Sequence, residues 1–285
     1  MTTYKALAVS TGYWKPSEDY IANIIHVVRG RVKDGDIVTV SEKAISTASG
    51  NIIDENKIKP SLTARFLAKY WTRTIWGCVL GPLCHLRRET IQRLRNYPFR
   101  EGARHKEVTL QHAGLLQAFM HGSEGGIDGS NLPYSYVSLA LTDASKIVQK
   151  IHTAIRQTLG RDVTVLIVDT DKTYSLGGFH FTPRPVSFKG IYSNGGVLAY
   201  IVGRSLKLKK RATPIAVAGE KLSTEEALRV ATIANKARGF GAGRTVWDMA
   251  EKFSVSLTQT SWEMLAKIEH KPIVIVRQAE RKIFA

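Results

Sequence analysis

Apolar residues along the chain occur both in short runs and at helical spacing, which predicts strands and helices in alternation. Four runs predict strands: residues 5–10, 37–40, 163–168 and 273–276. The third run, VTVLIV, carries no charged position, so we expect a central strand that is buried on both faces. The alternation favours a mixed α/β (or α+β) fold. We expect one compact unit over residues 1–285, with two lobes.

Helical spacing and capping signals predict seven helices. They cover residues 21–28 after a cap at Ser17, 62–71, 86–96, 143–159, a helix from the capping box at 223–226, 245–253, and one that starts near Ser261. Two stretches show no such period. The polar segment 41–51 and the glycine-rich segment 172–222 are therefore expected to be irregular.

The charge of the chain narrows the class of partner. Lys and Arg number 41 against 24 Asp and Glu, which gives a formal net charge of +17. This excess favours anionic partners, which include nucleotides, a polyanionic substrate, nucleic acid and an anionic membrane surface. Basic clusters lie at residues 87–95 and 207–211, but neither is interleaved with the aromatic residues of an RNA-reading surface.

Cysteine content and hydropathy indicate a cytoplasmic protein. Cys78 and Cys84 are too few for a disulfide scaffold, and we expect both to be buried apolar thiols. The N-terminus lacks the charged-then-apolar pattern of a signal peptide. No apolar run is long enough to predict a membrane span.

Asp169-Thr170-Asp171 directly follows the predicted central strand. In open α/β sheets, ligands bind at the carboxyl ends of strands, and carboxylate and hydroxyl oxygens are the ligands that Mg²⁺ prefers. Equally, an aspartate at this position caps a turn. The residues alone divide evenly between these two interpretations.

The glycine-rich stretch GSEGGIDGSN, residues 122–131, raises the same question. Glycines allow backbone amides to approach an anion closely, and Asp128 among them suits a cation held between the acid and phosphates. Asn131 is suited to reading a base or a ribose. The alternative is a plain Ile-Asp-Gly turn, which composition alone favours.

Several segments resemble motifs of the coenzyme F420-0:γ-glutamyl ligase family, and they occur along the chain in the same order as in the family. GIDGSN (126–131) resembles the family's "AGID-x-SN", and VLIVDTDK (165–172) resembles "VIITDT(F/N)GR". DGDIVTVSEKAIS (34–46) resembles "DGDVLVVAQKIVS", and KPS (59–61) stands where "x-x-PS" opens a helix. The likeness is good over residues 8–175 and weak at the last strand.

The resemblance implies a fold, a reaction and a set of site residues. The fold is an intertwined two-lobed α/β unit with a cleft, usually a homodimer. The reaction uses GTP (or ATP) and Mg²⁺ or Mn²⁺ to phosphorylate a small anionic carboxylate substrate and to join it to an amino acid such as L-glutamate, in the biosynthesis of F420 or of a folate- or pterin-like cofactor. The implied residues are Asp128 and Asp169 for catalysis, the same two with Thr170 and Asp171 for the metal, and Ser41, Lys43, Gly126, Asn131 and Lys172 for the nucleotide.

The chain also departs from the family pattern. The family's "SKAEG" reads STASG at 46–50, where Lys43 is a candidate to replace the missing lysine. Its "GEGG" stretch has no clean counterpart, although Glu269 lies near the place, and residues 239–262 look inserted or rebuilt. These departures keep an alternative open, in which the same fold binds nucleic acid or another polyanion through its basic surface.

Overall fold

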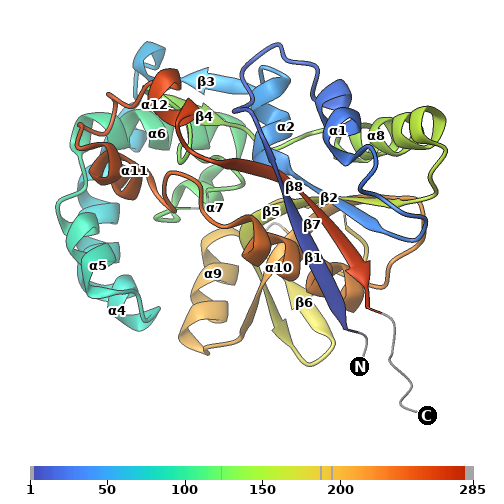
Figure 1. Ribbon diagram of the computed structural model, residues 1–285. Coiled ribbons are helices and arrows are strands. Elements are labelled where there is room, and N and C mark those ends of the chain that lie inside the picture. Colours follow the sequence, from blue (N-terminus) through green and yellow to red (C-terminus); the bar gives the residue numbers. More distant parts are fainter. Residues whose placement is uncertain (1–2, 123, 187, 194, 280–285) are drawn as a thin grey trace.

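The computed structural model describes residues 3–122, 124–186, 188–193 and 195–279, and a mixed sheet with helices on both faces forms its centre (Figure 1). The strand order is β1 (Tyr4–Thr11), β8 (His270–Gln278), β2 (Ile37–Ser41), β5 (Thr164–Leu176) and β6 (Phe179–Phe181), while β7 (Lys209–Ala218) pairs with the opposite edge of β5. Strands β2 and β5 are parallel, and the other neighbours are antiparallel. The predicted mixed α/β class is confirmed.

Strand β5 is buried on both faces, as its apolar run predicts. Val165 and Ile167 belong to the core cluster that also contains residues of α1 (Tyr20–Val28), α2 (Glu42–Ala48) and α8 (Ala144–Leu159). Leu166 and Val168 point to the other face and join the cluster with α10 (Thr224–Arg238). The apolar run of β5 thus ends directly at Asp169.

A second lobe of short elements lies beside the sheet (Figure 1). Its part before α8 contains β3 (Ile52–Asp54), η1 (Glu55–Lys57), α3 (Leu62–Phe66), the π-helix η2 (Leu67–Leu80), α4 (Gly81–Leu83), α5 (Arg88–Arg95), α6 (Phe99–His112), α7 (Leu115–Ala118) and β4 (Tyr136–Ser138). Later segments return to it, namely α9 (Gly196–Ser205), α11 (Val246–Phe253) and α12 (Trp262–Ala266). For example, Trp247 of α11 packs on Tyr97 beside α6.

Several sequence predictions are wrong in detail. Segment 41–51 is not a loop, because Ala44, Ile45 and Ala48 of α2 are buried against the sheet. The stretch 172–222 is not irregular, since β5 continues to Leu176 and is followed by β6, α9 and β7. Helix α1 is capped by Asp19, whose Oδ1 accepts from two backbone N–H groups at 3.0 Å, and not by Ser17.

The two cysteines differ in environment. Cys84 is buried as predicted, whereas Cys78 is exposed on η2, and both are free thiols. None of the helices within the described ranges is long and apolar enough to cross a membrane.

Candidate functional site

A cavity of about 470 Å³ opens where the parallel pairing of β2 with β5 ends, beside Ser41 and Asp169. We name it the aspartate cavity, because Asp128 and Asp169 both line it. Ser41 ends β2, Lys43 lies on the first turn of α2, and the start of β8 closes another side. The two acids that the sequence singles out, forty-one positions apart, therefore share one cavity.

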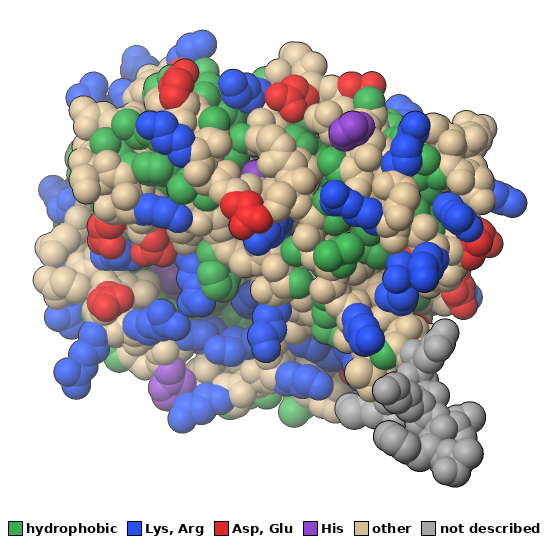
Figure 2. All heavy atoms as spheres, viewed as in Figure 1, with side chains coloured by type: hydrophobic (Ala, Val, Ile, Leu, Met, Phe, Trp, Pro, Cys, Tyr) green, Lys and Arg blue, Asp and Glu red, His purple; other side chains and the backbone are tan. Residues whose placement is uncertain are grey.

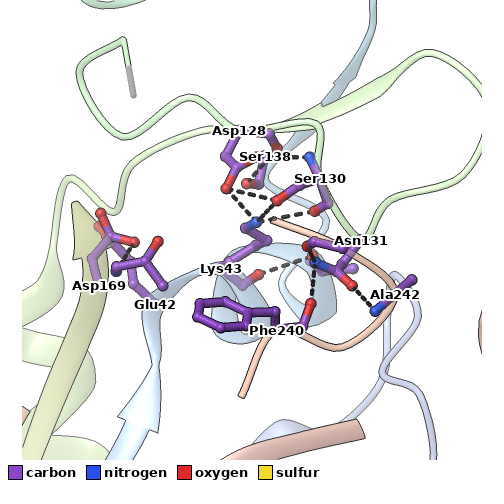
Figure 3. A network of polar contacts seen from close by, with 12 residues as sticks. Glu42, Lys43, Asp128, Ser130, Asn131, Ser138, Asp169, Phe240 and Ala242 are labelled. Atoms are coloured by element: carbon purple, nitrogen blue, oxygen red, sulfur yellow. Dashed lines mark hydrogen bonds and ion pairs between the residues drawn. The ribbon is translucent and has the colours of Figure 1, made fainter. Parts of the chain in front are cut away.

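Asp128 enters this cavity from the glycine-rich segment of residues 124–131, which we call the glycine loop. Its backbone exchanges hydrogen bonds with Ser138 at 3.2 and 3.0 Å, which holds the loop beside β4. Its carboxylate accepts from the Ser130 backbone N–H at 2.7 Å and forms an ion pair with Lys43. The Lys43 ammonium also donates to the Ser130 hydroxyl at 2.7 Å (Figure 3). Lys43 thus bridges Asp128 and Ser130 in the wall of the cavity.

Asp169 is held by a buried arginine. Arg184 forms an ion pair with Asp169 and donates to both carboxylate oxygens of Glu42, at 2.6 and 2.9 Å. Burial disfavours the charged form of Asp169, but the positive charges of Arg184 and Lys43 outweigh it and lower the pKa of this carboxyl. Asp169 therefore stays an anion, directly after the apolar half of β5. Sequence reasoning missed both Arg184 and Glu42.

Three further cations line the aspartate cavity. Lys172 donates to the Thr170 carbonyl at 2.6 Å, Arg238 donates to Asn235 at 3.1 Å, and the Arg244 guanidinium lies 3.9 Å from the centre of the Phe240 ring. In the part of the chain that the structure describes, none of the three forms an ion pair with a carboxylate. Burial lowers the pKa of both Lys172 and Arg238. The wall is thus suited to an anionic ligand.

The structure separates the predicted site residues into two groups. Seven of them line the aspartate cavity: Ser41, Lys43, Asp128, Asn131, Asp169, Thr170 and Lys172. Gly126 and Asp171 do not. Gly126 (φ +90°) lies against Arg184, where a Cβ would approach the guanidinium to 2.8 Å, so this glycine makes room for Arg184. Asp171 is buried at the β-bulge where β5 shifts its register with β7.

The Asn131 amide is bonded to backbone groups of a second loop. Its side-chain oxygen accepts from the Ala242 backbone N–H at 2.6 Å, and its amide nitrogen donates to the Gly243 carbonyl at 2.9 Å. The amide thus joins the glycine loop to a second loop, residues 239–244.

Glu269, near the place of the family's missing glutamate, also lines the cavity. Its carboxylate forms an ion pair with Lys271 at 2.6 Å and accepts a hydrogen bond from the Ser10 hydroxyl at 2.5 Å.

A second cavity of about 330 Å³ adjoins the first and shares Asp128, Thr170 and Arg244 with it. We name it the aromatic cavity. Its aromatic lining comprises Tyr97, Tyr134, Tyr136, Tyr200 and Trp247. The shared residues place any ligand of one cavity next to a ligand of the other.

A buried charge network supports the wall of the aromatic cavity. His105 Nδ1 lies 2.6 Å from a Glu55 oxygen, and its Nε2 lies 3.7 Å from Glu124. The fully buried Lys106 donates to Glu124 at 2.7 Å and to the Ala118 carbonyl at 2.8 Å. Burial alone would favour neutral His105, but the two glutamates outweigh it and raise the pKa to about 9.

The oxygen donors of the aspartate cavity suit a hard divalent cation. No cluster of three His, Cys, Asp or Glu side chains able to hold a metal occurs among the described residues. Mg²⁺ usually takes only one or two protein carboxylates and completes its shell with water and phosphate oxygens. Asp128 and Asp169, with the Thr170 hydroxyl between the two cavities, fit this pattern.

Comparison with known proteins assigns the chain to a family. A family model described as F420-0:Gamma-glutamyl ligase matches residues 8–219, which include Asp128, Asp169 and Lys43. The chain belongs to the F420-0:gamma-glutamyl ligase family. The match ends before residues 239–244, so this family model does not cover the loop that Asn131 fastens.

Three similar proteins differ in their sequence identity to this chain and in the share of the chain that they match. It is 34% identical to an uncharacterized protein of Methanocaldococcus jannaschii over 97% of each chain. It is 25% identical to the Coenzyme F420:L-glutamate ligase of Methanothermobacter thermautotrophicus over 66% of each chain, and 26% identical to that of Methanopyrus kandleri over 55% of each chain. The match therefore spans about two thirds of the Methanothermobacter ligase and about half of the Methanopyrus ligase.

Proposed function

We propose that the protein is a nucleotide- and divalent-metal-dependent amide ligase. It phosphorylates a substrate carboxylate and joins it to an amino acid such as L-glutamate, in the biosynthesis of F420 or of a related cofactor. The observation that carries this proposal is that two cavities of different chemistry meet at Asp128, Thr170 and Arg244. Family membership supports the reaction class, and the two named ligases support glutamate as the amino acid.

The nucleoside triphosphate belongs in the aspartate cavity. Five cationic side chains and three carboxylates line it, and among the described residues Lys172, Arg238 and Arg244 form no ion pair with a carboxylate. Their charges neutralise phosphate oxygens and favour the transition state of phosphoryl transfer, in which positioning and electrostatics supply most of the catalysis.

Asp128, Asp169 and Thr170 would hold the cation. A cation held there would supply charge neutralisation and orientation of the transferring phosphate. Lys43 and Arg184 hold the two carboxylates in place through their ion pairs. Glu42, on the far side of Arg184, fixes the guanidinium through two hydrogen bonds.

The acceptor belongs in the aromatic cavity, with its carboxylate at the shared residues. A carboxylate oxygen attacks the γ-phosphorus, the bond to the bridging oxygen breaks, and nucleoside diphosphate leaves. The amine of the amino acid then attacks the acyl carbon, loses a proton, and expels inorganic phosphate. Arg244 lines both cavities and so lies where a cation can neutralise the acyl phosphate.

The test measures phosphate release with GTP or ATP, Mg²⁺ or Mn²⁺, L-glutamate and F420-0. We expect release that requires all four components, and a product heavier by one glutamyl residue in mass spectrometry. Asp128→Asn and Asp169→Asn each remove a carboxylate that holds the metal, so we expect the rate to fall about a hundredfold or more. Asp162→Asn, an exposed acid that lines neither cavity, is the matched control.

Two results separate the possibilities. No nucleotide turnover with any acceptor, and no increase in melting temperature with nucleotide and metal, would contradict the ligase. Turnover with a folate or a pterin carboxylate, but not with F420-0, would support the ligase proposal with a different acceptor substrate.

The family resemblance also leads us to expect a homodimer. Light scattering, which measures the molar mass in solution, tests this expectation.

A further inference from the structure

The loop of residues 239–244 forms one wall of the aspartate cavity, directly after α10. Gly239, Phe240, Gly241, Gly243 and Arg244 all line the cavity. The loop lies outside the family match, which ends at residue 219. Its role therefore has to be derived from its own contacts.

The Asn131 side chain fastens this loop to the glycine loop that carries Asp128 (Figure 3). Besides its bonds to Ala242 and Gly243, the Asn131 amide nitrogen donates to the Phe240 carbonyl at 3.3 Å. Gly241 has φ +59°, and a Cβ there would lie 2.6 Å from the Asn131 oxygen, so this contact requires glycine. The position of Phe240 is thus fixed relative to Asp128.

Phe240 is the aromatic residue of this cavity that has a ring face available. It exposes 47% of its surface, and Arg244 covers only one face of the ring, at 3.9 Å. Tyr13 and His270 also line the cavity, but their rings stack on each other with centroids 4.5 Å apart. Trp14 is buried in the core. An exposed ring beside cations matches the planar base of a nucleotide.

We propose that Phe240 stacks on the nucleobase, and that the loop 239–244 is the base-binding wall of the nucleotide site. The proposal rests on the proposed function, because it needs the triphosphate in the aspartate cavity. The base lies on the open face of Phe240, opposite Arg244. Lys172 and Arg238 on the neighbouring wall take the phosphates. Asn131, whose amide is used to hold the loop, positions Phe240.

The experiment compares a ligand that has a base with one that has none. Titration calorimetry measures the Kd of GTP and of inorganic tripolyphosphate, both with Mg²⁺, for the wild type and for Phe240→Ala. Because base–aromatic stacking contributes to GTP binding alone, we expect Phe240→Ala to weaken GTP about tenfold or more and to change tripolyphosphate by less than about twofold. Phe240→Trp restores GTP binding.

Phe66→Ala is the control, since this exposed phenylalanine of α3 lines neither cavity. Equal weakening of both ligands by Phe240→Ala, or no weakening of either, overturns the stacking role while the ligase proposal stands. A wild type that binds tripolyphosphate as tightly as GTP also overturns it. A wild type that binds neither ligand contradicts the proposed function first, and the stacking role with it.

Discussion

Arg184 is the side chain on which the geometry of the aspartate cavity depends most. It is 1% exposed and contacts Glu42 and Asp169, so it lies between two carboxylates, one from the start of α2 and one from β5. A buried charge that loses its partner costs far more than an exposed one, because it keeps its desolvation penalty without the compensating attraction. The stability of the fold and the position of Asp169 are therefore linked through one guanidinium.

This link predicts the effect of Arg184→Met. The substitution leaves Glu42 buried without a cation, so we expect the free energy of unfolding to fall by about 3–5 kcal/mol. Urea denaturation measures it. The double variant Glu42→Gln with Arg184→Met removes both charges and should recover part of the loss. Arg161→Met breaks the exposed pair with Asp34 and should cost at most about 1 kcal/mol. A single Arg184→Met variant no less stable than this control would contradict the argument.

The two site aspartates were predictable from local patterns, but their partners were not. Asp169 follows a run of apolar residues, and Asp128 lies among glycines, so each has a signal in its own neighbourhood. Arg184 lies in an irregular segment between two prolines, 142 positions from Glu42. No local pattern indicates such a pair, because it forms only when the folded sheet brings the two segments together. The same holds for Asn131, which has a partner 111 positions away.

At the scale of elements, α6 fixes the segment that leads into the glycine loop. Lys106 binds the Ala118 carbonyl and Glu124, and His105 binds Glu55 on η1. The pKa of His105, about 9 in the folded protein, lies above the ordinary value of about 6.5. The folded state therefore binds this proton more tightly than the unfolded state. The resulting stabilisation is fully present below pH of about 6.5 and is lost as the pH rises through about 9.

His105→Gln should therefore destabilise the protein in a pH-dependent way. We expect the difference in the free energy of unfolding between wild type and variant to be larger at pH of about 6 than at pH of about 10, by at most roughly 3 kcal/mol. Chemical denaturation at a series of pH values measures this. His112→Gln, at the exposed end of the same helix, is the control. A difference that does not change with pH would show that His105 is not charged in the folded state.

Helix starts were easier to predict than strands with polar residues. Ser223 caps α10 as expected, since its hydroxyl accepts from the Glu226 N–H at 3.3 Å. The Glu226 carboxylate, however, accepts from Tyr4 of β1 at 2.7 Å and does not return to the cap. Strand β7 was missed because it starts with three basic residues, Lys209, Lys210 and Arg211. Only its second half is apolar in sequence. Likewise, α2 was missed because small and polar residues form its buried face.

At the scale of the whole molecule, the positive charge extends beyond the cavities. Figure 2 shows that Lys and Arg side chains gather in the lower half of one face. A net charge of +17 attracts any polyanion, whatever its sequence, through the release of its counterions. The nucleic-acid alternative thus rests on a property that the ligase also has, and binding alone does not distinguish the two.

Competition between ligands does distinguish them. We expect a labelled single-stranded RNA to bind at low salt, with log K falling by about 0.7 per contacted phosphate for each unit of log salt. Because this binding uses the outer surface, Asp128→Asn should leave it unchanged, and saturating GTP with Mg²⁺ should not displace the RNA. Fluorescence anisotropy measures both. Displacement of RNA by GTP would instead place the RNA in the aspartate cavity, and a flat salt titration would remove the electrostatic account. Asp128→Asn adds a second criterion, because the ligase proposal predicts that it abolishes the metal-dependent binding of nucleotide. If RNA binding is unchanged in this variant, the two ligands occupy separate parts of the surface. If RNA binding falls as well, they share one site.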